Sequence, residues 1–266
     1  MLNRKLAALI DKAVFDYNLI EDGDRILLGI SGGKDSTLLA EYLSLRTKRF
    51  LGKTEVNPAE PRFVFKSLHI HSEIEGPLSD EIKSLYNSWN IDVEEKQIDV
   101  LGRLKLGRTM NCYWCSTQRR KELLDYAIAN GYNKIALGHH LDDILETLIM
   151  NSTEHAELST MPVRLQYEKF PVSVIRPLCY VPVTMIVEQA EAEKWKSLTC
   201  TCTYQDNSAR KDARRKLSVL CDDDYNKKMH LFNSLKNIQK EYLQRKYQKD
   251  QWRHQVRDTQ QKRMPV

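Results

Sequence analysis

The chain of 266 residues carries a formal net charge of +5, and 41% of its residues are hydrophobic. That apolar fraction excludes a chain that is disordered throughout, and the length suggests one large domain or one domain with an appendage. No apolar run is long enough to cross a membrane, and the first twenty residues lack the apolar centre and cleavage site of a signal peptide. We therefore expect a cytoplasmic protein without a membrane segment.

The hydrophobic pattern predicts strands and helices that alternate along the chain. After an amphipathic helix at residues 4–17, strands are expected at 24–30, 63–71, 91–99, 134–138 and 172–178. Helices are expected at 34–46, 79–89, 119–130, 141–151 and 184–195. Strands that alternate with helices pair in parallel. We therefore expect an α/β fold with a doubly wound, mainly parallel, Rossmann-like sheet, an N-terminal helix and a basic C-terminal helical extension.

Three segments are expected: an N-terminal helix at 1–20, the α/β domain at 21–222 and a basic helical tail at 223–266. The tail holds eleven Lys and Arg against five Asp and Glu, a net charge of +6, so the other 222 residues carry −1. Residues 224–258 contain neither Pro nor Gly, which predicts one long helix or a pair of helices. Such a segment is typical of contact with a nucleic acid or another polyanion, although a solvated helical face has the same composition.

A glycine-rich segment, "GISGGKDST" at residues 29–37, follows the first strand and opens a helix. In doubly wound sheets ligands bind beyond the carboxyl ends of strands, and a helix N-terminus approached by glycine backbone favours anions. The segment fits neither a Walker loop nor GxGxxG. It predicts a phosphate site, with a plain turn as the alternative. The candidate binding residues are Ser31, Gly32, Gly33, Lys34, Asp35 and Ser36. Lys34 adds a charge that could also serve catalysis, and Asp35 would orient the loop or help to hold Mg²⁺.

Six cysteines stand at positions 112, 115, 179, 200, 202 and 221. Cys112 and Cys115 form a CxxC pair just before a predicted helix, where the helix dipole favours thiolates. The pair alone fits a thioredoxin-like site, half of a zinc site, or two ligands of an iron–sulfur cluster, with Cys200 or Cys202 as a third ligand. Trp114 inside the pair could stack on a base or pack in the core.

The sequence "HHLDD" follows the strand at 134–138. His139 and His140 are metal ligands by type, although local hydrogen bonds explain them equally well. Asp142 and Asp143 open a helix, where capping is the simplest role.

The glycine segment matches S-G-G-x-D-S, the pyrophosphate loop of the ATP pyrophosphatase superfamily. That loop is followed by CxxC and RR, by "ALGHHLDDILETL", by "IRPL" and by a Cys before "NSARK". In this order the chain resembles the tRNA 2-thiocytidine synthetase family over roughly residues 20–221. The resemblance implies an enzyme that cleaves ATP to AMP and pyrophosphate. It would adenylate a cytidine, cytidine 32 of the anticodon loop, and replace the 2-oxygen with sulfur.

The same resemblance implies cofactors and site residues. ATP, Mg²⁺ and a [4Fe–4S] cluster are expected, the cluster held by Cys112, Cys115 and Cys202. Cys202 is chosen because it fits the family pattern C-x-x-Q-x-N-x-x-R. The family often has another Cys three residues before that position, whereas Cys200 stands only two before it. Asp143 matches a catalytic carboxylate, and Arg119 a basic residue near the acceptor.

The implied partners are tRNA and a sulfur donor, either a cysteine desulfurase or inorganic sulfide, and a homodimer is a further expectation. The related uridine-thiolating branch carries CxxC pairs at its termini. This chain has no Cys before 112 or after 221, which favours the cytidine branch. The alternatives are a tRNA uridine thiolase, another PP-loop enzyme such as a lysidine synthetase or a sulfonucleotide reductase, and a non-catalytic nucleic-acid or metal-binding module.

Overall fold

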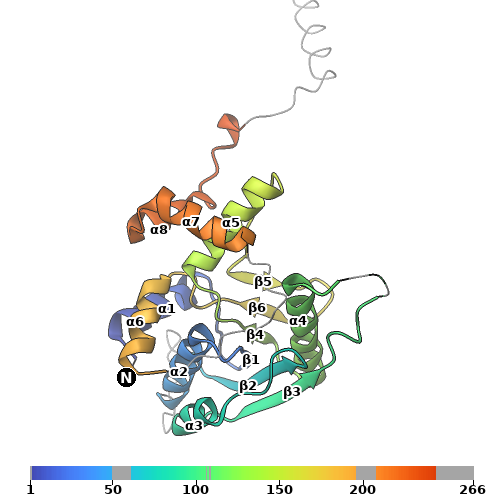
Figure 1. Ribbon diagram of the computed structural model, residues 1–266. Helices are drawn as coiled ribbons and strands as arrows, with labels where there is room; N and C mark the ends of the chain where they lie inside the picture. Colours follow the sequence, from blue (N-terminus) through green and yellow to red (C-terminus); the bar gives the residue numbers. More distant parts are fainter. Residues whose placement is uncertain (1, 50–60, 106, 108, 196–207, 244–266) are drawn as a thin grey trace, which may run out of the picture. The chain divides into compact units, whose positions relative to one another are not determined.

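The computed structural model describes residues 2–49, 61–105, 107, 109–195 and 208–243. Within them, six strands form one sheet in the order β3-β2-β1-β4-β6-β5 (Figure 1). The strands are β1 (Asp24–Ile30), β2 (Phe63–Ser72), β3 (Val93–Ile98), β4 (Lys134–Ala136), β5 (Arg164–Gln166) and β6 (Ser173–Ile175). All neighbours pair in parallel except β5, which runs antiparallel to β6 at one edge. The predicted mainly parallel sheet is confirmed.

Helices cover both faces of the sheet, as a doubly wound fold requires. They are α1 (Arg4–Asp16), α2 (Lys34–Lys48), α3 (Asp80–Ser88), α4 (Cys112–Ala129), α5 (Leu141–Glu154), α6 (Val183–Ala192), α7 (Ser208–Cys221) and α8 (Tyr225–Ser234), followed by a short 3₁₀ helix η1 (Lys240–Tyr242). None of these helices combines the length and the apolar composition that a membrane crossing needs.

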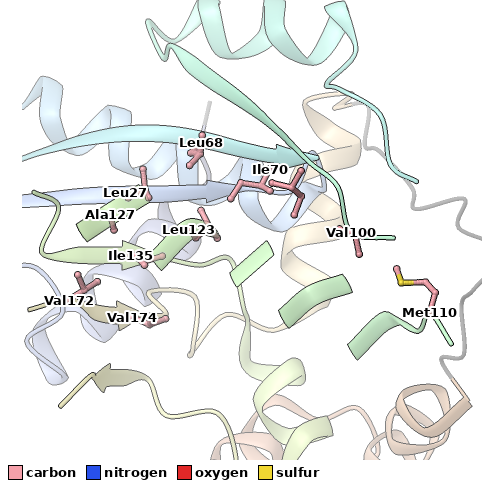
Figure 2. Packing of buried hydrophobic residues seen from close by; sticks show 11 residues of the cluster. Leu27, Leu68, Ile70, Val100, Met110, Leu123, Ala127, Ile135, Val172 and Val174 are labelled. Carbon is pink, nitrogen blue, oxygen red and sulfur yellow. The ribbon is translucent and has the colours of Figure 1, made fainter. Parts of the chain in front are cut away.

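The core on one face of the sheet lies under α4. Leu123 and Ala127 of this helix belong to the same buried cluster as Leu27 of β1 and Ile135 of β4 (Figure 2). Successive side chains of a strand point to opposite faces, so buried Leu28 faces the other side of the sheet. That side is covered by α2, whose residues contact β1 and β2.

The strand order places a switch point between β1 and β4. From β1 the chain proceeds outward through β2 and β3, and from β4 it proceeds the opposite way to β6. Ligands of open α/β sheets bind at the carboxyl ends of the strands at such a point. The segments that follow β1 and β4 are the glycine-rich loop and "HHLDD", so the fold brings the two predicted motifs together at this end of the sheet. The region between residues 31–36 and 138–143 is called the crevice below.

The CxxC pair lies inside a helix and not before one, which corrects the prediction. Helix α4 begins at Cys112, seven residues earlier than expected. Its N-cap is Asn111, whose side chain accepts a hydrogen bond from the Trp114 backbone N–H at 2.8 Å. This cap satisfies one of the first backbone donors and lets the cysteines form the first turn.

Two elements were not predicted. Strand β5 has three residues and pairs only with β6, too short a stretch for an alternation pattern. Helix α7 packs on α5 (Figure 1). Its buried residues, Ala213, Leu217 and Cys221, recur every four positions, but five Lys and Arg among fourteen residues obscure that pattern.

The C-terminal segment differs from the prediction in two ways. A single helix over 224–258 is wrong where the structure describes it, because α8 ends at Ser234 in turns closed by the Asn233 and Ser234 carbonyls. The compact units are residues 1–232 and 233–266, so the boundary lies ten residues beyond the predicted start of the tail. The reason is that α8 buries Lys228 and Phe232 in the first unit. Residues 244–266 lie outside the described residues.

Candidate functional site

The glycine-rich loop joins β1 to α2 through a backbone that glycine favours. Gly32 has φ of +76°, in the left-handed region. Gly33 is the N-cap of α2 and supplies no side-chain cap. The first backbone N–H groups of α2 therefore face the crevice at the positive end of the helix dipole, an arrangement that favours an anion.

Hydrogen bonds among the predicted loop residues hold this turn. Gly33 N–H donates to Ser31 Oγ at 3.2 Å, and Ser36 Oγ donates to Gly33 O at 2.9 Å. The hydroxyls of Ser31 and Ser36 lie 3.1 Å apart. Each hydroxyl has one proton, and that of Ser36 is already donated, so Ser31 is the donor between them. The loop is thus closed by a ring of hydrogen bonds among its own residues.

Lys34 and Asp35 follow directly at the start of α2. Lys34 Nζ lies 3.2 Å from Asp35 Oδ1. That carboxylate oxygen is buried but makes no hydrogen bond with the described residues. A buried carboxylate oxygen that has a cation beside it but accepts no hydrogen bond still has capacity for a further ligand. The pair therefore fits a site for phosphate together with a divalent cation.

The segment after β4 lies against this loop. A Cβ added at Gly138 would lie 2.9 Å from Ser36 N and 3.0 Å from the carbonyl carbon of Asp35, so only glycine permits the approach. His140 Nε2 lies 4.0 Å from Asp35 Oδ1 and 3.4 Å from Asp143 Oδ2. The motif after β4 is thereby joined to the loop after β1.

His140 and Asp143 cap α5 reciprocally. Asp143 N–H donates to His140 Nδ1 at 3.4 Å, and His140 N–H donates to Asp143 Oδ2 at 3.2 Å. Because Nδ1 accepts, the neutral imidazole carries its proton on Nε2, the nitrogen that faces the two carboxylates. Asp143 therefore has the predicted capping role, His140 makes the local hydrogen bonds that were the alternative to metal ligation, and both lie beside the glycine-rich loop.

His139 is held by local hydrogen bonding. Arg176 follows β6 and donates from Nε to His139 Nδ1 at 3.2 Å and from Nη1 to Pro162 O at 2.5 Å. Burial, and then the charge of Arg176, lowers the pKa of His139 to about 4. The imidazole is neutral near pH 7, and its Nδ1 is already occupied by a donor.

The loop sequence and the fold both have close counterparts among known proteins. The PP-loop domain family matches residues 1–220. The tRNA-cytidine(32) 2-sulfurtransferase of Syntrophotalea carbinolica is 31% identical over 248 residues, covering 91% of this chain and 92% of the relative. The tRNA-cytidine(32) 2-sulfurtransferase of Xylella fastidiosa is 36% identical over 217 residues, covering 79% of this chain and 69% of the relative.

The chain belongs to the tRNA-cytidine(32) 2-sulfurtransferase family of PP-loop proteins.

A solved structure confirms the fold of this sulfurtransferase. The U34-tRNA thiolase NcsA from Methanococcus maripaludis, solved with its [4Fe–4S] cluster, aligns with a TM-score of 0.69 at 24% identity. The match covers 91% of this chain and 80% of that chain. The predicted family and enzyme class, a tRNA 2-thiocytidine synthetase-like sulfurtransferase, are confirmed by the sequence relatives.

The sulfurtransferase presents its cysteine pair at the N-terminus of α4. Cys112 and Cys115 are both half-buried in the first turn. Cys202 and Cys200 lie outside the described residues. Consistent with this, the part of the chain that the structure describes gathers no three His, Cys, Asp or Glu side chains as a metal site.

The sequence left two roles open for Trp114, stacking on a base and packing in the core, and the structure supports packing. Its indole Nε1 donates to Val100 O at 3.2 Å, and the ring packs against the buried cluster that includes Met110. The indole is partly buried and held by this hydrogen bond, which supports the packing role.

Arg119 lies one turn after the cysteine pair and is ion-paired. Its Nη1 contacts Glu75, in the loop that follows β2. The predicted basic residue is therefore near the cysteines, but a carboxylate of this sulfurtransferase already neutralises it.

Arg210 is a site residue that the sequence argument did not single out. It lies in the first turn of α7, and its Nη1 is 3.4 Å from Asp143 Oδ1. The signal was present, because Arg210 is the final Arg of the family pattern that was used to choose Cys202.

Proposed function

We propose that this sulfurtransferase thiolates a tRNA cytidine, cytidine 32, at the expense of ATP. The observation that carries the proposal is the pyrophosphate loop at the switch point of the sheet, where Asp35 Oδ1 is buried beside the Lys34 ammonium and accepts no hydrogen bond from the described residues. The names of the relatives support tRNA cytidine as the substrate. A cysteine desulfurase or inorganic sulfide would supply sulfur, and a homodimer in the cytoplasm is the proposed assembly.

The chemistry has two steps. The 2-oxygen of cytidine attacks the α-phosphorus of ATP, and the bond to the β-phosphate breaks with its electron pair leaving on pyrophosphate. Sulfur at the oxidation level of sulfide then bonds to C2 with its own electron pair, and AMP leaves with the original oxygen and the electrons of the C2–O bond. Persulfide sulfur from a desulfurase would first need two electrons from a thiol reductant. Adenylation is needed because the base oxygen alone is a poor leaving group.

The loop residues would stabilise the first step. The uncapped N–H groups of α2 and the Lys34 ammonium meet the charge that develops on the phosphates. Asp35 would hold Mg²⁺, which supplies further charge neutralisation when it is bound. The ring of hydrogen bonds through Ser31, Gly33 and Ser36 keeps these groups in position.

The cysteines would serve the second step. Cys112 and Cys115 stand three residues apart on one helical turn, so their thiols share a face at the positive helix end, where thiolates are favoured. Such a pair fits two corners of a [4Fe–4S] cluster, with Cys202 as the third ligand. The cluster, when bound, supplies an open iron coordination position for sulfur. Arg119 would exchange Glu75 for a tRNA phosphate.

The nucleotide proposal is tested with Asp35→Ala. With tRNA present, we expect the wild type to release AMP and pyrophosphate and the variant to lose at least about 100-fold in rate, because a charge-stabilising group is removed. Asp80→Ala is the matched control, since Asp80 is an exposed acid in the first turn of α3. Release of ADP and phosphate from the wild type would contradict the proposal. Mass analysis of the product nucleosides separates 2-thiocytidine from 2-thiouridine.

A buried tyrosine supports the start of α2. Tyr86 OH lies 2.9 Å from Thr37 Oγ1, which donates its own proton to Gly33 O at 3.1 Å. Tyr86 is therefore the donor to Thr37. Burial raises the pKa of Tyr86 to about 12, so the phenol keeps the proton it donates.

We expect Tyr86→Phe to weaken ATP binding several-fold and to cost about 1 kcal/mol of unfolding free energy, the usual value of one hydrogen bond. Tyr42→Phe is the control, because Tyr42 of α2 is buried as Tyr86 of α3 is, but it donates to Asp11 at 2.7 Å and not to the start of α2. It should lose similar stability and keep wild-type affinity. Calorimetric titration with a non-hydrolysable ATP analogue, beside urea unfolding, measures both. Equal affinities of the two variants would rule the role out.

The C-terminal segment is proposed to contact tRNA phosphates. Residues 235–266 hold nine Lys and Arg against three Asp and Glu, so the whole +6 lies beyond α8. A chain that ends at Ser234 keeps the buried Lys228 and Phe232. Because each cation–phosphate contact releases counterions, this truncation should weaken tRNA binding and flatten its salt dependence, while ATP affinity stays unchanged.

The rival role for the same segment is packing, with Tyr242, Leu243 and Trp252 as an apolar face. Truncation would then lower the melting temperature, whereas the tRNA role leaves it unchanged. An unchanged melting temperature together with an unchanged salt dependence of tRNA binding would contradict both the packing role and the tRNA role.

A further inference from the structure

Arg210 brings a cation into the crevice from a helix outside the sheet's α/β units. Its side chain is 43% exposed, whereas that of its partner Asp143 is 15% exposed. The contact is single, at 3.4 Å, and a guanidinium has five N–H donors. Asp143 also lies beside His140, which in turn faces Asp35 of the pyrophosphate loop. Arg210 is thus connected to Asp35 of the loop through two intervening side chains, Asp143 and His140.

Arg214, one turn later on α7, forms an ion pair with a structural role and can be compared with the Arg210–Asp143 pair. Its Nε donates to Glu146 Oε1 at 2.7 Å and its Nη2 to Glu146 Oε2 at 3.5 Å. The Glu146 side chain is 1% exposed, so Arg214 neutralises a buried carboxylate. This two-point contact fixes α7 on α5. Arg210 is not needed for that purpose.

The other arginines described near the crevice already contact other groups. Arg119 is paired with Glu75. Arg176 is buried and donates to His139 and Pro162. Among the described residues, Lys34 is the remaining cation at the loop, 3.2 Å from Asp35. Attack on the α-phosphorus builds charge on its non-bridging oxygens as well as on the leaving pyrophosphate, and one lysine serves one of these sites.

We propose that Arg210 is a catalytic residue of the adenylation step, in which its guanidinium binds the non-bridging oxygens of the ATP α-phosphate. The inference rests on the proposed function. Asp143 orients the guanidinium from one side, and the remaining N–H donors face the phosphate. Arg210 transfers no proton. The cytidine oxygen bonds to phosphorus, pyrophosphate leaves with the electron pair, and the arginine compensates the charge.

The helix that carries Arg210 begins only six residues after Cys202 in the sequence. If α7 supplies a group to adenylation, the same helix links the nucleotide step to the segment that carries the proposed third cysteine. The adenylation site is then complete only when α7 is docked on α5.

The test compares three arginines of α7 in the full chain with tRNA and ATP. We expect Arg210→Ala to lower kcat for AMP formation about 100-fold, the usual loss for one charge-stabilising donor, with an unchanged melting temperature. Arg210→Lys should recover part of the rate, because it keeps the charge but not the planar fork. Guanidinium added to Arg210→Ala should restore activity, a rescue that a purely structural role does not give.

Two controls on the same helix make the result specific. Arg214→Ala should lower the melting temperature, since it breaks the pair with buried Glu146. It should lose much less kcat than Arg210→Ala, because the buried residues Ala213, Leu217 and Cys221 still hold α7 in place. Arg215→Ala removes the same charge from a residue that pairs with Asp212 of its own helix, and should change neither. Wild-type kcat in Arg210→Ala, or an equal loss in Arg215→Ala, overturns the inference. A wild type that forms no AMP with tRNA refutes the proposed function instead.

Discussion

Cys112→Ser, Cys115→Ser and Cys202→Ser should each abolish tRNA thiolation and the visible absorption of the anaerobically reconstituted protein. The reason is that a cluster held by three thiolates loses its site when one becomes a hydroxyl, which is a poor ligand for iron. Cys112 and Cys115 cannot replace each other, because each occupies its own position on α4 and can supply only one thiolate. The loss should exceed about 100-fold in the rate of thiolation, while ATP binding at the loop after β1 is retained.

The remaining cysteines provide the controls. Cys179 and Cys221 are buried, and burial raises the pKa of the Cys221 thiol, so neither is suited to bind a metal as a thiolate. Cys179→Ser and Cys221→Ser should keep the cluster. If Cys200→Ser loses the cluster and Cys202→Ser retains it, the third ligand is Cys200 and the assignment to Cys202 is wrong by two positions. Tightly bound zinc without iron in protein purified without oxygen would refute the cluster.

Local patterns in the sequence predicted the sheet and the loop. A strand such as Asp24–Ile30 and the helix that begins at Lys34 are defined by apolar spacing and by two glycines at their junction. The phosphate site follows from the same few residues, because its donors are the backbone of the turn. Such features depend on neighbours in the chain, and for that reason they could be read without a structure.

Contacts between distant segments could not be predicted in this way. Arg210 and Asp143 are 67 residues apart, and only the packing of α7 on α5 brings them together. The start of α4 was misplaced for a different reason. The apolar spacing predicts a start at Arg119, whereas the helix begins seven residues earlier, where the side chain of Asn111 caps it.

The predicted tail likewise failed at a distant contact. Lys228 was counted with the solvated basic residues, but its Nζ lies 2.7 Å from Asp142 Oδ1, 86 residues away in α5. The two side chains are 4% and 6% exposed. Burial alone would lower the pKa of Lys228. The hydrogen bond and the charge of Asp142 raise this pKa by more than burial lowers it, so the net shift is upward. The stabilisation is complete below the unfolded pKa of about 10.4 and is lost as the pH rises through the folded pKa.

Asp142→Ala should therefore destabilise the fold by about 3 kcal/mol, because the buried ammonium loses its close, buried counter-charge and keeps only the exposed Asp223 carboxylate at 3.6 Å. The Val183 backbone N–H at the start of α6 also loses its acceptor, Asp142 Oδ2, at 2.8 Å. Urea unfolding at pH 7 measures the loss. The double variant Asp142→Asn/Lys228→Met should recover most of it, since no unpaired charge remains inside. Lys121→Ala breaks an exposed pair with Asp125, whose side chains are 62% and 48% exposed, and should cost less than about 1 kcal/mol. A loss in Asp142→Ala no larger than in that control would show that α8 is not anchored through this pair.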